Sequence, residues 1–84
     1  MNKRRRKTLD RILSKPTRAD ITWDEARTLF DAIGAEIFEG KGSRVLVVLE
    51  TRILRFHKPH PQKELKKYAV ELIRDFLMNA GVVE

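Results

Sequence analysis

The two histidines of this chain, His57 and His60, lie in one short segment that is also rich in lysine, residues 56–67. Imidazole exchanges protons near neutral pH, so a histidine can act as a general acid or a general base. Lysines beside it can bind the phosphates of a polyanion. This combination predicts a protein that binds RNA and acts on it chemically.

Cleavage of RNA without a metal ion needs only a few side chains. A base removes the proton of a ribose 2′-hydroxyl, an acid protonates the 5′-oxygen, and cations stabilise the charge on the phosphate. Arg44 and His57 are each about seven residues from a tight turn at Glu50 and Thr51, so they should pair across a hairpin. We therefore predict that His57 is the acid or base and that Arg44 holds the phosphate. The alternative is that His57 is only a strand-end residue on a half-exposed face.

His60 is the second candidate for the catalytic residue. The pair His60-Pro61 precedes the last predicted helix, and proline is well tolerated at a first helical position. A role for His60 as a helix cap or a partner contact is therefore the main alternative to catalysis.

Further basic side chains surround the histidines, and we predict that they bind RNA together with Arg44: Arg55, Lys58, Lys63, Lys66 and Lys67. The last three are expected at the start of the final helix, where basic residues oppose the helix dipole. That mismatch favours phosphate binding over a merely solvated helix start.

Composition agrees with a small basic domain. The chain has 84 residues, with 18 Lys and Arg against 12 Asp and Glu, which leaves a formal charge of +6. Such a balance is typical of proteins that bind nucleic acid or another polyanion. There is no cysteine, and two histidines separated by two residues make a poor metal site, so we expect neither a metal nor a cofactor. No apolar run approaches the roughly 20 residues that span a bilayer, so we expect a cytoplasmic protein.

Hydrophobic periodicity predicts an α+β fold. The expected order is a basic arm (1–7), a short helix that stops before Pro16, a helix capped by Thr22 and ended by Gly34, strands at 35–39, 43–50 and 52–58, and a last helix ended by Gly81. The last helix should bury Ala69, Leu72, Ile73, Phe76, Leu77 and Ala80, with Glu71, Arg74 and Asp75 on its solvated face. Both main helices should cover one face of a three-stranded antiparallel sheet and leave the other face partly open.

Several of these segments also resemble one family. Gly42-Ser43, His60-Pro61-Gln62-Lys63-Glu64-Leu65-Lys66-Lys67 and Phe76-Leu77-Met78-Asn79-Ala80-Gly81, in this order between Trp23 and Val82, resemble the HicA toxins of bacterial toxin–antitoxin pairs. The resemblance implies a fold like a double-stranded-RNA-binding domain in residues 21–84, preceded by an additional arm and short helix in residues 1–20. It also implies an endoribonuclease that cuts mRNA and a HicB-like antitoxin that silences it. We expect the free toxin to be a monomer.

One position departs from the family pattern. HicA toxins carry a catalytic histidine directly after the Gly-Ser pair, and Arg44 occupies that position here. Two hypotheses follow from this departure. Either the catalytic histidine has moved, with His57 as the candidate, or the chain has lost cleavage and is a non-catalytic RNA-binding module or an interaction subunit.

Overall fold

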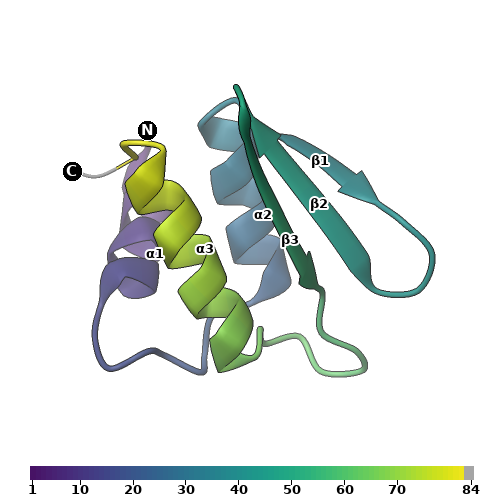
Figure 1. The fold of residues 1–84 in the computed structure, drawn as a ribbon. Coiled ribbons are helices and arrows are strands. Elements are labelled where there is room, and N and C mark those ends of the chain that lie inside the picture. The colour runs from purple at the N-terminus through teal and green to yellow at the C-terminus, as the bar shows by residue number, and fades with distance from the viewer. Residues whose placement is uncertain (83–84) are drawn as a thin grey trace.

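The computed structural model describes residues 1–82. Its elements are α1 (Lys3–Leu13), α2 (Trp23–Ala32), β1 (Glu36–Glu39), β2 (Arg44–Leu49), β3 (Arg52–His57) and α3 (Lys67–Asn79). The strands form one antiparallel sheet in the order β1-β2-β3. Helices α2 and α3 contact this sheet, whereas α1 packs against α2 and α3 (Figure 1). The predicted α-β-β-β-α order with an additional N-terminal helix is confirmed.

The register of the hairpin separates a buried face from an open face. Val45 pairs with Phe56 and Val47 pairs with Leu54, and all four side chains are buried beneath the helices. Because successive side chains in a strand point to opposite faces, the residues between them point away from the core. The sheet therefore presents an open face on the side opposite α2 and α3.

Helix α2 begins and ends as its sequence predicts. The Thr22 side chain accepts a hydrogen bond from the Glu25 N–H, and the Glu25 carboxylate accepts one from the Thr22 N–H, which completes a capping box. At the other end Gly34 has a φ of 83°, and the Ala35 N–H donates to the Phe30 carbonyl oxygen. This left-handed glycine turns the chain directly into β1.

Helix α1 is longer than expected. Asn2 caps it and its first residue is Lys3, so most of the predicted basic arm is helical. The helix buries Leu9 and Ile12, which places it in the same core as α2 and α3.

The buried stripe of α3 differs from the predicted one. Leu72 is exposed, while Val70 and Arg74 are buried. Arg74 was expected on the solvated face, but its guanidinium reaches across to the C-terminal end of α1. Main-chain acceptors there satisfy the buried charge, which allows a polar residue in the core.

The start of α3 also differs from the prediction. The helix begins at Lys67, and its N-cap is Lys66. His60 and Pro61 therefore lie in the preceding loop, joined by a cis peptide bond, and neither caps the helix. The loop is anchored instead by its backbone, because the Leu65 N–H donates to the Ile21 carbonyl oxygen and the Trp23 N–H donates to that of Lys63.

Candidate functional site

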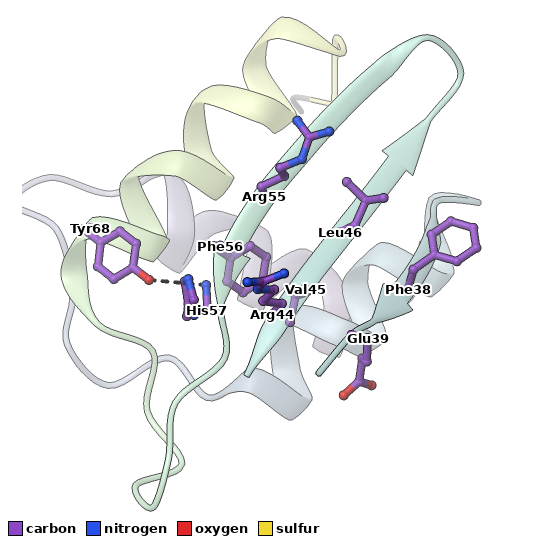
Figure 2. A pocket seen from close by; sticks show the side chains of 10 residues that line it. Phe38, Glu39, Arg44, Val45, Leu46, Arg55, Phe56, His57 and Tyr68 are labelled. Carbon is purple, nitrogen blue, oxygen red and sulfur yellow. Dashed lines mark hydrogen bonds between the residues drawn. The ribbon is translucent and has the colours of Figure 1, made fainter. Parts of the chain in front are cut away.

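Arg44 and His57 lie directly opposite each other at one end of the hairpin. The cross-strand pairing that the turn predicts is therefore confirmed. The Lys58 N–H donates to the Ser43 carbonyl oxygen, so the hydrogen bond between the strands belongs to the neighbouring pair, Ser43 and Lys58. Arg44 and His57 therefore form a non-hydrogen-bonded pair. Side chains of such pairs are especially close, with Cα atoms about 4.5 Å apart. Both side chains are exposed on the open face (Figure 2).

Two polar contacts position His57. Its Nδ1 atom lies 3.1 Å from the Ser43 hydroxyl oxygen. Its main-chain N–H points away from β2, because His57 belongs to a non-hydrogen-bonded pair. Since β3 is an edge strand, this N–H donates instead to the Tyr68 hydroxyl oxygen at 3.3 Å (Figure 2). Within residues 1–82 no group is hydrogen-bonded to Nε2 of His57, so this nitrogen can exchange a proton with a substrate.

Arg44 and Arg55 supply the positive charge of the site. Arg55 pairs with Leu46 and therefore lies on the same face as Arg44, one row along the hairpin. Both guanidinium groups are exposed, and neither has a carboxylate partner within residues 1–82. An unpaired guanidinium can bind a phosphate through two parallel hydrogen bonds.

These side chains line a concave surface on the open face, which encloses a volume of about 610 Å³. The residues that line it are Phe38, Glu39, Gly40, Arg44, Val45, Leu46, Arg55, Phe56, His57 and Tyr68 (Figure 2). We name this surface the basic concavity. Sequence reasoning missed Phe38 and Tyr68. The available signal was their position outside the core-facing periodicity of their own elements.

The remaining predicted residues are distributed differently. Lys58 is paired with Glu39, so a carboxylate already balances its charge. His60 and Lys63 lie in the loop before α3, and Lys66 and Lys67 lie at the helix start; all four are exposed outside the basic concavity. The fold therefore brings together Arg44, Arg55 and His57, and leaves the predicted lysines outside the basic concavity.

A polar cluster at the N-terminal end of α2 has a different character. Arg11 bonds the Glu25 carboxylate at 2.7 Å and the Asp20 carbonyl oxygen at 2.8 Å. Burial opposes ionisation of Glu25, but hydrogen bonds from Thr22 and Arg11 outweigh it and lower the pKa of this carboxyl. The hydrogen bond from Arg18 likewise lowers the pKa of Asp20. These contacts join α1, the connector between the helices (residues 14–22) and α2, so we interpret the cluster as structural.

Two further features bear on the kind of protein. Within residues 1–82 there is no group of three or more histidine, cysteine or acidic side chains placed to hold a metal ion. None of the described helices is both long and apolar enough to cross a membrane.

Comparison with known proteins identifies the family. The family model described as the HicA toxin of bacterial toxin–antitoxin systems matches residues 23–82. No curated protein and no solved structure matches the chain. The matched region contains the whole sheet, α2, α3 and the basic concavity, and leaves α1 and the connector outside. The chain belongs to the HicA toxin family, and so it is a toxin of a bacterial toxin–antitoxin system with an antitoxin as its partner.

Proposed function

We propose that this toxin is a metal-independent endoribonuclease that cuts mRNA, with His57 as its catalytic residue. The observation that carries the proposal is the pairing of His57 with Arg44 on an exposed sheet face. An imidazole beside an unpaired guanidinium combines proton transfer with phosphate binding. Family membership supports the reaction class, because HicA toxins are generally ribonucleases.

The reaction needs only one covalent exchange at phosphorus. The ribose 2′-oxygen forms a bond to phosphorus while the bond from phosphorus to the 5′-oxygen breaks, which leaves a cyclic phosphate and a 5′-hydroxyl. The free Nε2 of His57 takes the 2′-hydroxyl proton or supplies the proton of the leaving oxygen, and water exchanges the other proton. Arg44 and Arg55 stabilise the negative charge that builds on the phosphate oxygens.

Ser43 and Tyr68 support this assignment of His57. The Ser43 hydroxyl at Nδ1 sets the plane of the imidazole, and the Tyr68 hydroxyl holds the backbone of the strand end. A catalytic group held at two points loses less entropy when the substrate binds. The lysines at 63, 66 and 67 would extend phosphate binding along the RNA backbone, and Lys58 would join them by exchanging its Glu39 partner for a phosphate.

The antitoxin would be a HicB-like protein that covers the basic concavity. An acidic surface on that partner would suit a face that exposes Arg44 and Arg55 and a chain with a formal charge of +6. We further propose that the free toxin is a cytoplasmic monomer in which residues 21–84 form the RNA-processing unit.

One observation favours a second function. Arg44 stands directly after Gly42-Ser43, where the resemblance to HicA toxins places a catalytic histidine. If His57 does not replace that histidine, the same surface is a non-catalytic RNA-binding module or an interaction subunit. His60, which lies in the exposed loop, is the remaining histidine.

The experiment is incubation of labelled RNA with the purified toxin in the presence of a chelator. His57→Ala should reduce the cleavage rate by about 10²–10⁴-fold while RNA affinity and thermal unfolding stay close to wild type. His60→Ala is the matched control, since it removes a histidine outside the basic concavity. Arg44→Ala should weaken RNA binding as well as cleavage.

Three outcomes distinguish the hypotheses. Cleavage that only His57→Ala and Arg44→Ala impair supports the ribonuclease proposal. Cleavage that survives His57→Ala but is lost in His60→Ala reassigns the catalytic residue. RNA binding with no cleavage by any form of the protein leaves a binding module.

A further inference from the structure

Two aromatic rings are exposed at the basic concavity. Phe38 on β1 is 51% exposed, and Tyr68 on α3 is 43% exposed. Both line the concavity, on opposite sides of Arg44 and His57 (Figure 2). Large aromatic rings are usually buried because they remove much apolar surface from water. Their joint exposure at one basic surface therefore points to a ligand.

The fold holds each ring outward for a separate reason. In β1 the side chain of Ile37 packs against the core, so Phe38 points to the other face, where it forms a cross-strand row with Leu46 and Arg55. Tyr68 precedes the buried Ala69 at the start of α3. Its hydroxyl accepts the His57 N–H, which ties the ring to the strand that carries the candidate catalytic residue.

We propose that Phe38 and Tyr68 stack on unpaired nucleobases on either side of the phosphate that Arg44 and Arg55 bind. The inference rests on the ribonuclease function proposed above and names its substrate class as single-stranded RNA. Bases within a duplex are covered by their neighbours, whereas unpaired bases are free to stack on aromatic side chains. A single strand of RNA offers two kinds of contact, its bases for stacking and its phosphates for binding to cations, and this sheet face has groups for both.

The spacing of the sheet assigns the two rings to different nucleotides. Neighbouring strands lie about 4.8 Å apart, so β1 lies about 10 Å from β3 across the sheet. Tyr68 lies beyond β3, because it contacts the outward-pointing N–H of that edge strand. A base on Phe38 and a base on Tyr68 therefore cannot belong to one nucleotide, and the phosphate between them falls near Arg44 and His57.

Charge favours RNA over an apolar protein surface as the occupant of the rings. Arg44 and Arg55 lie between Phe38 and Tyr68 and have no carboxylate partner within residues 1–82. A purely apolar partner would have to desolvate both guanidinium groups without compensation. A strand of RNA supplies phosphates for the cations and bases for the rings.

The test is fluorescence anisotropy with a short 2′-O-methyl RNA strand, alone and annealed to its complement. This probe lacks the 2′-hydroxyl and cannot be cleaved by the proposed mechanism. The variants are Phe38→Leu and Tyr68→Leu, which keep an apolar side chain but remove the ring, and Tyr68→Phe, which keeps the ring but removes the hydroxyl. Ile53→Ala is the matched control, because Ile53 is an exposed apolar residue of β3 outside the basic concavity.

Phe38→Leu and Tyr68→Leu should each weaken binding of the single strand on the order of 5- to 100-fold, because each removes one stacking contact. Tyr68→Phe should lose less single-strand affinity than Tyr68→Leu because it keeps the ring. Ile53→Ala should bind the single strand within about threefold of wild type, and duplex affinity should not change in any variant. Thermal unfolding of each variant reports whether it is folded.

Single-strand affinity that both leucine variants retain would overturn the inference, and so would an equal loss of affinity for the duplex. Loss of antitoxin binding alone would assign the rings to the protein partner instead. Cleavage is measured separately. Binding that depends on the rings, without cleavage, supports the stacking inference and refutes the ribonuclease proposal. Cleavage together with binding that does not depend on the rings supports the ribonuclease proposal and refutes the stacking inference.

Discussion

Arg74 is the residue whose replacement should destabilise this protein in the most informative way. Its side chain is 8% exposed and lies between α1 and α3. Nε donates to the Ile12 carbonyl oxygen at 3.0 Å, and Nη2 donates to the Ser14 carbonyl oxygen at 3.1 Å and the Thr17 hydroxyl at 2.8 Å. The guanidinium therefore occupies the negative end of the α1 dipole, where helical carbonyls lack partners.

The expected cost follows from these three hydrogen bonds. Each bond to a charged group contributes roughly 1.5–3 kcal/mol. In Arg74→Met the Ser14 and Thr17 oxygens can recover water because they are only partly buried, whereas the bond to the Ile12 oxygen is buried. We expect a loss of about 3 kcal/mol in the free energy of unfolding, at the low end of values for breaking buried charged contacts. For a domain of this size the midpoint temperature of thermal unfolding should fall by about 12 °C or more.

The assay is thermal and urea unfolding of Arg74→Met and Arg74→Lys, with amide hydrogen exchange in α1. Lysine keeps the charge but lacks the planar fork, so Arg74→Lys should lose an intermediate amount. Arg27→Met is the control, because Arg27 is an exposed arginine of α2 in an ion pair with Asp24 and should contribute under about 1 kcal/mol. If Arg74→Met lowers stability no more than Arg27→Met, the buried guanidinium does not hold α1 in place.

Three further predictions concern pH, helix termination and catalysis. The folded-state pKa of Glu25 lies below its ordinary value of 4.5, so the stabilising contribution of its carboxylate is complete above pH 4.5 and is lost as pH falls through the lowered pKa. The free energy of unfolding should therefore fall less steeply with decreasing pH in Glu25→Gln than in wild type. Gly34→Ala should cost about 1 kcal/mol in urea unfolding, because φ is 83° and the added Cβ meets no atom within 4 Å; an unchanged midpoint would refute this backbone argument. Ser43→Ala should slow RNA cleavage about 2- to 10-fold at unchanged RNA affinity, since it removes one hydrogen bond that orients His57; equal rates would show that the bond is dispensable.

Local sequence signals predicted most of the fold. The capping box at Thr22 and Glu25 and the glycine at 34 bound α2 at both ends, because these signals act within a few residues of the chain. The hairpin register also followed from local information. A tight turn between alternating strands allows few pairings, and this brought Arg44 opposite His57.

Prediction failed where a residue's role depends on distant partners. Arg74 has the polar side chain and helical position of a solvated residue, and only the docking of α1 supplies the acceptors that bury it. The lysines and the proline before α3 predict an earlier helix start than the structure has. Two backbone hydrogen bonds to a distant segment hold these residues as a loop: the Leu65 N–H donates to the Ile21 carbonyl oxygen, and the Trp23 N–H donates to that of Lys63.

The sequence by itself determined the basic charge, the order of helices and strands, the family and the residues that can exchange protons or bind phosphate. Tertiary structure decided which of them meet. It joined Arg44, Arg55 and His57 on one open face, paired Lys58 with Glu39, left His60 in a separate loop, and added Phe38 and Tyr68 from elements on either side. The reason is physical: composition and periodicity act along the chain, whereas a site depends on distances across strands and between a helix and a sheet edge.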